Sequence, residues 1–395
     1  MELYTVKFET ESPRKIVADD MILTKGSPTT AGSKMLESYE SLFEAEVLTR
    51  LSAGGYALSG KARVGEFAMD LLGESAYGGA LVKDGSLVYP SAEILREGEA
   101  VAAINLDVNG APRRAAAQSG IVCVKPTYGT VSRYGVIPVA CSGETVTVSA
   151  TSAAVCREVL SVISGHDEKD GTSLSEADCR SALEAKPIKK VAILKDMTAN
   201  AEVSAKIAEM REALTAMGIE VAEVDGGVIA ASSAAWNILM SAELCNNVSR
   251  YDGVKYGYRA ESFSGIDELY TNSRTEAFGE LLKTTILYGS DRLSTENYMK
   301  VYDKALRSRR VIVEAFAALF ESYDAVMLPA TSSMRYSAEA VSEDKYLVFE
   351  ENRYTAPASV TGLPAVVFGG VQLVGRAFSE GSMLELASAY EEGKQ

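Results

Sequence analysis

A strand–helix–strand pattern near the middle of the chain constrains the fold most. Residues 189–194 read as a short buried strand, and residues 219–224 alternate like a second one. Between them, apolar residues recur at steps of four and three, as on one face of a helix: Val203, Ile207, Met210, Leu214 and Met217. Gly218 then stops the helix. Two strands joined by a helix make a right-handed crossover onto one sheet, so the pattern predicts an α/β architecture.

The rest of the chain extends this pattern without a visible boundary. Residues 301–320 read as a long helix, and residues 325–328 read as a buried strand closed by Pro329. No internal repeat, low-complexity tract or Pro/Gly/Ser-rich linker interrupts the sequence. We therefore expect a single domain over residues 1–395.

Charge and composition exclude several classes of protein. The 395 residues include 39 basic and 54 acidic ones, a net charge of −15, and the basic residues do not cluster. Such a surface repels phosphate backbones and anionic lipid, so no direct binding to nucleic acid or membranes is expected. The sequence shows no signal peptide, no apolar run near 20 residues, and five scattered cysteines that suit reduced thiols. These features predict a cytoplasmic protein.

Common catalytic motifs are missing from the sequence. The only histidine, His166, lies in a polar, turn-like stretch, which argues against a Ser-His-Asp triad or an ordinary zinc site. No glycine-rich nucleotide-binding loop occurs either. No cofactor and no metal are therefore expected.

Three longer segments do carry recognisable motifs. They are KPTYGTVSRYG at residues 125–135, GHDEKDGTS at 165–173 and RYDGVKYGYR at 250–259. Shorter matches run in the same order from about residue 16 to the C-terminus, at residues 29–37, 66–69, 354–357 and 362–365. The chain resembles the amidase-signature family, and within it the A subunits of the tRNA-dependent amidotransferases that make Gln-tRNA and Asn-tRNA. The helical N-terminal region usual in that family is missing.

The resemblance implies a fold, a chemistry and partners. The family fold is one α/β/α domain around a twisted mixed β-sheet. Its chemistry uses a serine nucleophile, a second serine in a cis-peptide that relays a proton, and a lysine base. A glycine-rich loop supplies N–H donors to the oxyanion. The family's A subunits work with B and C subunits, so partners like GatB and GatC are implied.

The residues at the family's catalytic positions differ from that pattern. The lysine position carries Asp19, and an ungapped count from Lys125 places the relay serine at Leu87 and the nucleophile at Ala111. Alanine cannot attack a carbonyl, leucine cannot relay a proton, and aspartate inverts the charge. Of the supporting glycines beside the nucleophile, only Gly110 remains.

The substrate-pocket positions are altered as well. The family's arginine, which would hold a substrate carboxylate, is replaced within Thr284 and Thr285, and the acidic residue for the substrate ammonium reads Asn352. Changing arginine to threonine removes a bidentate carboxylate clamp. We interpret Lys125 and the other retained motifs as packing and turn residues.

Three hypotheses follow. The first is a catalytically inactive pseudo-amidase that acts as a non-catalytic or assembly subunit. The second is an active amidase, or an active A subunit of an amidotransferase, that releases ammonia from glutamine through a relocated nucleophile; Ser91, Ser119 and Cys245 are the candidates. The third is a small-molecule binding protein that uses the old pocket.

Overall fold

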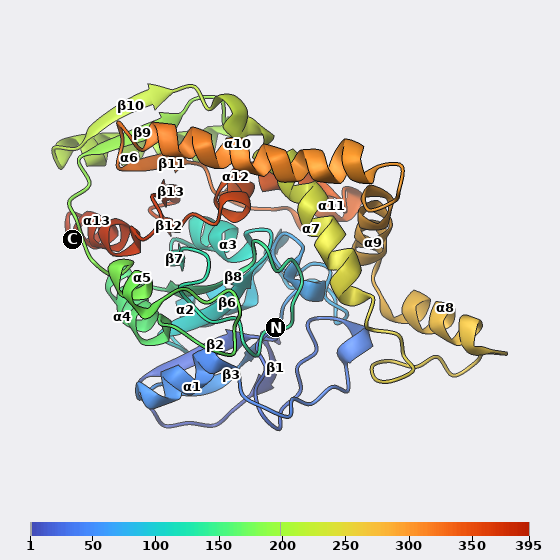
Figure 1. Ribbon diagram of the computed structural model, residues 1–395. Coiled ribbons are helices and arrows are strands. Elements are labelled where there is room, and N and C mark those ends of the chain that lie inside the picture. Colours follow the sequence, from blue (N-terminus) through green and yellow to red (C-terminus); the bar gives the residue numbers. More distant parts are fainter. Residues whose placement is uncertain (1, 198, 395) are drawn as a thin grey trace.

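The computed structural model describes residues 2–197 and 199–394, which form a large mixed sheet between helical layers (Figure 1). In spatial order the strands of this sheet are β1 (Tyr4–Lys7), β3 (Ala57–Ala62), β2 (Lys15–Asp19), β6 (Ala102–Asp107), β8 (Thr145–Ala150), β7 (Val122–Lys125), β12 (Ala365–Phe368), β13 (Val371–Gly375), β11 (Ala325–Leu328), β9 (Lys190–Leu194) and β10 (Glu220–Val224). Four neighbouring pairs are parallel, namely β2–β3, β2–β6, β9–β11 and β9–β10. The predicted α/β fold around a mixed sheet is confirmed.

The helices have the following bounds. They are α1 (Glu46–Ala53), α2 (Pro90–Arg96), α3 (Ala111–Ser119), α4 (Ala153–Ile163), α5 (Glu176–Ser181), α6 (Ala201–Ala216), α7 (Ser232–Val248), α8 (Ile266–Ala277), α9 (Glu280–Arg292), α10 (Asp303–Leu319), α11 (Ala338–Glu343), α12 (Leu347–Thr361) and α13 (Glu380–Glu392). Short 3₁₀ segments lie at Lys34–Leu36, Glu66–Ala68 and Gly227–Ala231, and a π-helical turn spans Tyr298–Tyr302. A separate hairpin pairs β4 (Val82–Lys83) with β5 (Ser86–Leu87).

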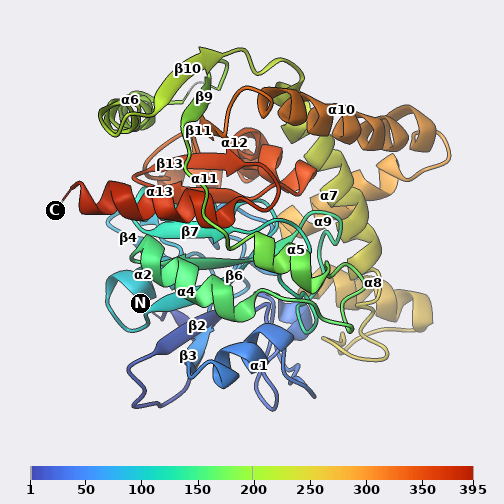
Figure 2. The same cartoon turned by 60° about the vertical axis from the view of Figure 1, so that its left-hand side comes forward.

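Helices cover the middle of the sheet from both sides. Figures 1 and 2 show α4 and α13 on one side and α3, α7 and α12 on the other. The central strands β6 and β8 are consequently buried along their whole length. Polar side chains are therefore buried on these strands as well, Asn105 on β6 and Thr147 on β8 among them.

The central strand–helix–strand prediction is confirmed. Strands β9 and β10 pair in parallel, with Lys190 opposite Glu220, and α6 connects them. The Asn200 side chain caps α6 by accepting a hydrogen bond from the Val203 N–H. Gly218 follows the helix with φ of 81°, a left-handed conformation that glycine adopts at low cost.

The predicted helix over residues 301–320 and strand over 325–328 are also present. The π-helical turn leads into α10, and β11 occupies the predicted strand residues. One further helical stretch, residues 227–248, is long and apolar enough to cross a membrane by composition alone. This stretch contradicts the expectation that no apolar run approaches that length. Half of it is buried inside the protein, where Trp236 and Leu239 are among its core residues.

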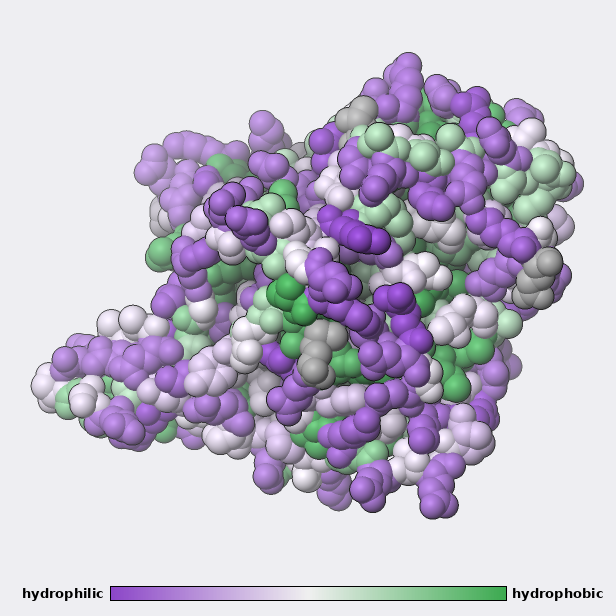
Figure 3. Space-filling model, turned by 180° about the vertical axis from the view of Figure 1, so that it is seen from behind, coloured by the Kyte–Doolittle hydropathy of each residue, from purple (hydrophilic) through white to green (hydrophobic). Residues whose placement is uncertain are grey.

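One part of the chain extends away from the body. The segment around α8 projects to one side in Figure 1, and exposed aromatic and aliphatic side chains lie along it: Tyr256, Phe263, Ile266 and Tyr270. The opposite view in Figure 3 shows a mainly hydrophilic surface with hydrophobic residues in small groups. The α8 projection therefore carries exposed aromatic and aliphatic side chains away from the body of the protein.

The sheet also determines where the family's catalytic positions meet. Strands β2 and β6 are parallel neighbours, so their carboxyl ends lie at the same edge. Asp19 ends β2, Asp107 ends β6, and the chain turns from β6 into α3 through Gly110. Side chains from these ends and from the start of α3 form the candidate site.

Candidate functional site

The three segments that carry the family's catalytic positions converge. Asp19 accepts a hydrogen bond from Tyr89, two residues after Leu87, and another from Asn105, on the strand that leads to Ala111. All three positions are buried, with exposed fractions of 0% for Asp19, 8% for Leu87 and 3% for Ala111. The segments therefore lie close together, and the assignment of these residues to the family's catalytic positions stays a prediction.

Asp19 is a buried carboxyl held by neutral donors. Its Oδ2 accepts from the Tyr89 hydroxyl at 2.9 Å and from the Leu106 N–H at 3.2 Å, and its Oδ1 accepts from Asn105 Nδ2 at 2.9 Å. Burial raises the pKa of Asp19 to about 7, although these hydrogen bonds lower it. Among the described residues, no lysine or arginine lies within ion-pair distance of it. The position thus holds a carboxyl group where the resemblance implies a lysine, and its hydrogen-bond partners are all neutral.

A buried lysine close by, which the sequence analysis missed, pairs with a different acid. Lys61 on β3 forms an ion pair with Asp20 at 2.9 Å and also donates to the Pro28 carbonyl at 2.7 Å and to the Thr29 hydroxyl. Burial lowers the pKa of Lys61, whereas Asp20 raises it. The charge of Lys61 is therefore balanced by Asp20 and not by Asp19, the residue before it.

The start of α3 places a methyl group where the family has a nucleophile. Gly110 has φ of 90°, and a Cβ built on it would lie 2.4 Å from the Thr355 Cβ. The Thr355 hydroxyl donates to the Asn109 carbonyl at 2.7 Å. Thr355 on α12 therefore packs directly against the loop that would hold an oxyanion, and Ala111 offers no heteroatom to a substrate.

Leu87 lies on a tight hairpin. The turn residues Asp84 and Gly85 have φ of 50° and 75°, the two positive values of a type I′ turn. The Leu87 N–H donates to the Tyr336 carbonyl at 2.9 Å, and its side chain lines two cavities of about 300 Å³ each. A proton relay cannot pass through this aliphatic side chain.

The pocket positions are filled by internal hydrogen bonds. Asn352 is fully buried; its Nδ2 donates to Asn237 Oδ1 at 2.7 Å and Asn109 Oδ1 at 3.2 Å, and its Oδ1 accepts from Arg114 Nη2 at 2.9 Å. Thr285 is buried and donates to the Leu281 carbonyl on its own helix. The amide of Asn352 and the hydroxyl of Thr285 are therefore satisfied by other groups of the protein.

Thr284, the neighbouring clamp position, contacts a different residue. Its hydroxyl lies 3.2 Å from the Tyr346 hydroxyl, at the surface. It therefore belongs neither to the buried amide cluster around Asn352 nor to a carboxylate clamp.

Two adjacent arginines of α3 are buried in different ways. All five donors of Arg113 are used: two bond Asp107, and the others bond the Thr355 carbonyl, Gln372 and Ser359. Arg114 donates only through Nη2, to Asn352 and Thr355, and its Nε and Nη1 have no partner among the described residues. The sequence analysis identified neither arginine, because their partners lie far away along the chain.

None of the substitute nucleophiles contacts a group in the described part of the chain that would activate it. The Ser91 hydroxyl is buried and accepts from Asn105 Nδ2 at 2.8 Å. Burial raises the pKa of the Cys245 thiol, which reduces its thiolate fraction. Ser119 lines one of the cavities that contact Leu87, and no hydrogen bond to its side chain occurs among the described residues. A serine needs an adjacent base to become nucleophilic.

The retained motifs make packing contacts. Lys125 is fully buried and donates to the carbonyls of Pro126 and Leu363; burial lowers its pKa to about 7. The Tyr128 hydroxyl donates to the Cys141 carbonyl, and Tyr258 bonds the Met35 carbonyl through its N–H. His166 is exposed in a loop, as predicted. These contacts support a structural role for the motifs.

Comparisons with known proteins agree over most of the chain. A family model described as Amidase matches residues 16–82 and 91–384, so that the segment containing Leu87 falls in the gap between the two matched parts. The chain is 35% identical over 402 residues to the A subunit of glutamyl-tRNA(Gln) amidotransferase from Latilactobacillus sakei, covering 95% of this chain and 82% of the relative. It is 34% identical to the corresponding protein of Acinetobacter baumannii, covering 94% and 81%.

Solved structures show the same fold. The crystal structure of the A subunit of glutamyl-tRNA(Gln) amidotransferase from Thermotoga maritima has a TM-score of 0.80 at 25% identity, covering 99% of this chain and 87% of that one. The structure of 6-aminohexanoate cyclic dimer hydrolase complexed with substrate has a TM-score of 0.81 at 18% identity, covering 96% and 84%.

The buried acid at position 19 makes stability depend on pH. Since its pKa rises from 3.8 unfolded to about 7 folded, the folded state retains the proton, and the stability contribution of Asp19 falls as pH rises between these values. The slope is at most about 1.4 kcal/mol per pH unit. Asp19→Asn removes this dependence. We expect the free energy of unfolding, measured by urea denaturation, to fall by about 3 kcal/mol more in the wild type than in the variant between pH 4.5 and pH 7.5.

A matched control isolates Asp19 from other buried acids. Burial raises the pKa of Glu66 to about 7 and that of Glu74 to about 8. Both acids are present in the wild type and in the variant, so their contribution to the pH dependence of stability cancels in the comparison. Glu168→Gln changes an exposed side chain that has no partner among the described residues, and it should follow the wild type at both pH values. If the free energy of unfolding changed equally between the two pH values in Asp19→Asn and in the wild type, Asp19 would be ionised at both.

Proposed function

The chain belongs to the amidase family, and we propose that within it the protein is a catalytically inactive pseudo-amidase that serves as a non-catalytic or assembly subunit. The observation that carries this proposal is the buried Asp19 carboxyl, which occupies the position of the family's lysine base and is held by three neutral donors. Supporting observations are the methyl group of Ala111 at the start of α3 and the aliphatic Leu87 on its hairpin.

Ala111 and Leu87 each remove a separate requirement of amide hydrolysis, and Asp19 replaces the family's lysine by a carboxyl group. The reaction needs an attacking heteroatom, a proton relay, and a base able to take up the proton. In a serine protease, loss of the nucleophile alone lowers kcat about 10⁶-fold, and loss of the other members adds little. The amide of Asn352, at the position that the resemblance assigns to the substrate ammonium, is also already hydrogen-bonded to Asn109 and Asn237.

The names of the similar proteins support an alternative, an active enzyme. The similar proteins are named as A subunits of glutamyl-tRNA(Gln) amidotransferase, so an active enzyme with a relocated nucleophile is the second candidate function. The surroundings of Ser91 and Cys245 argue against it, since neither has a base beside it in the described part of the chain.

The likeness to these relatives also suggests the kind of partner. A protein without catalytic activity can still function by binding other chains. The relatives are named as A subunits, which implies an enzyme of several subunits. The α8 projection, which follows the retained segment at residues 250–259, presents exposed apolar side chains of the kind found at protein interfaces. We infer that partners like GatB and GatC bind there, that residues 1–395 act as one domain, and that the protein works in the cytoplasm.

Loss of catalysis can be measured directly. The purified protein should release ammonia from glutamine or asparagine no faster than buffer, because no residue is available to form an acyl-enzyme. A coupled glutamate dehydrogenase assay, with an active amidase-family enzyme as positive control, makes the measurement. Ser91→Ala and Cys245→Ala should give the same background. Ammonia release that one of these substitutions abolishes would establish the relocated nucleophile.

Complex formation is tested by co-expression with B and C subunits from the same genome. The three chains should co-elute in size exclusion chromatography, and the double substitution Phe263→Asp and Ile266→Asp on the α8 projection should separate them, because it places charges in an apolar contact. Val82→Asp changes a comparably exposed apolar residue elsewhere and should leave the complex intact. Separate elution of the unmodified chains would reject this role.

Restoring the catalytic residues should not restore activity. The triple variant Asp19→Lys, Leu87→Ser and Ala111→Ser regains the three catalytic side chains. It leaves Asn352, Asn109 and Thr355 hydrogen-bonded to one another beside position 111, where we expect them to keep a substrate from binding. Positioning of a substrate accounts for about 7–11 kcal/mol of a typical barrier. We expect glutamine turnover at background. Turnover within tenfold of an active relative would mean that the pocket has remained functional.

A further inference from the structure

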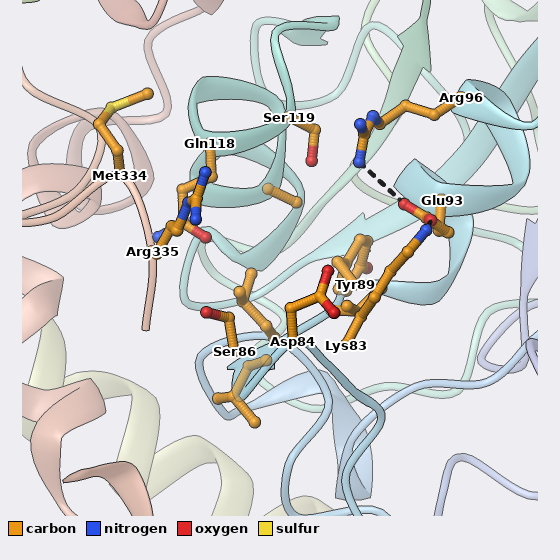
Figure 4. Close-up of a pocket in the computed structure, with 14 residues that line it drawn as sticks. Lys83, Asp84, Ser86, Tyr89, Glu93, Arg96, Gln118, Ser119, Met334 and Arg335 are labelled. Carbon is orange, nitrogen blue, oxygen red and sulfur yellow. Dashed lines mark hydrogen bonds and ion pairs between the residues drawn. The ribbon is translucent and has the colours of Figure 1, made fainter. Parts of the chain in front are cut away.

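A polar cavity of about 300 Å³ lies between the β4–β5 hairpin, α2 and the end of α3 (Figure 4). Its charged and polar lining residues include Lys83, Asp84, Arg96, Gln118, Ser119 and Arg335. Arg335 and Gln118 lie on one side of it in Figure 4, and Arg96 and Lys83 on the other. Cations thus face the cavity from opposite walls.

A buried carboxylate holds two of these cations in place. Glu93 on α2 is only 4% exposed; it pairs with Arg96 Nη1 at 3.0 Å and with Lys83 Nζ. The hydrogen bond and charge of Glu93 raise the pKa of Lys83, which therefore stays protonated. Each cation uses a single donor on Glu93, so four N–H groups of Arg96 and two of Lys83 remain available.

The opposite wall has a free cation. Among the described residues, the guanidinium of Arg335 has no hydrogen bond or ion pair, and the hydroxyls of Ser86 and Ser119 have no partner either. The cavity therefore presents many donors and few acceptors. Asp84, at the hairpin turn, contributes a carboxylate that is likewise unpaired within the described chain.

The balance of charges points to a phosphate. The lining residues include three cations, Lys83, Arg96 and Arg335, and two carboxylates, Glu93 and Asp84, in a chain whose net charge is −15; Glu97, outside the lining, also acts on Lys83. A phosphate monoester carries a charge of about −1.5 to −2 at pH 7 and three acceptor oxygens. Arginine and lysine on two sides of a cavity are the groups that recognise such an oxyanion.

We infer that this cavity binds a small phosphate monoester, with the phosphoryl group between Arg335 on one wall and the Glu93-held pair Arg96 and Lys83 on the other. Asp84 repels a second anionic group and accepts hydrogen bonds, so the organic part of the ligand carries a hydroxyl or amino group. A volume of about 300 Å³ is at the lower end of ligand pockets, which limits the ligand to a small metabolite.

The site lies where this chain departs from its family. Lys83, Asp84 and Ser86 fall within residues 83–90, the segment that the family model does not match. The hairpin at the position of the relay-serine loop thus supplies part of the cavity wall. The inference concerns binding alone and does not depend on whether glutamine is hydrolysed.

Isothermal titration calorimetry with inorganic phosphate as the probe, at pH 7.5 and low salt, tests the inference. The wild type should bind one phosphate per chain, and Arg335→Gln should weaken binding at least about tenfold, because charged hydrogen bonds from a free guanidinium are lost. Arg376→Gln, at an exposed arginine outside the cavity, should bind like the wild type. Lys83→Gln should weaken binding from the opposite wall.

Three results would overturn the inference. One is the absence of phosphate binding up to about 20 mM, a concentration at which even a weak site of about 1 mM affinity would be filled. Another is equal affinity of the Arg335→Gln and Arg376→Gln variants. The third is tighter binding of succinate than of phosphate, which would show a dicarboxylate site. Because Arg335 is exposed and has no partner among the described residues, its variant should melt like the wild type, so a loss of binding cannot be ascribed to unfolding.

Discussion

The buried ion pair between Arg113 and Asp107 is the interaction on which the rest of the structure depends. It joins the end of β6 to the first turn of α3, and the remaining donors of Arg113 reach α12 and β13, 242 to 259 residues further along the chain. Breaking such a pair by removing one partner leaves a buried charge and typically costs about 3–5 kcal/mol. The N-terminal and C-terminal parts of the sheet are thus fixed to each other at the edge that carries the candidate site.

Local patterns were sufficient to predict several elements of the fold. The crossover of β9, α6 and β10, and strand β11, follow from apolar periods that neighbouring residues create. The order of the strands in the sheet could not be obtained in this way, because β12 and β13 return from the C-terminus to lie between β7 and β11. The motifs, through their family resemblance, supplied the fold that periodicity alone left open.

The sequence indicates which of the family's catalytic side chains are absent, but it does not indicate which hydrogen-bond partners surround the site. The assignment of Ala111, Leu87 and Asp19 to the family's catalytic positions rests on counting from Lys125 and from the N-terminal motif, and it stays a prediction. The partners of Asp19, Tyr89 and Asn105, could not, because they are 70 and 86 residues away and follow no pattern. Active sites normally retain polar groups without internal partners for the substrate to bind. Here the amide of Asn352 is satisfied by Asn109, Asn237 and Arg114, whereas Nε and Nη1 of Arg114 have no partner among the described residues. Only a three-dimensional structure could reveal this.

The close approach of Thr355 to Gly110 has a consequence for how such chains evolve. Any side chain at position 110 would collide with Thr355, whether or not the neighbouring residue can attack a substrate. A glycine kept by packing will persist in descendants long after selection for turnover has ended. The presence of Gly110 beside Ala111 is therefore no evidence for or against catalysis, because packing alone is enough to keep it.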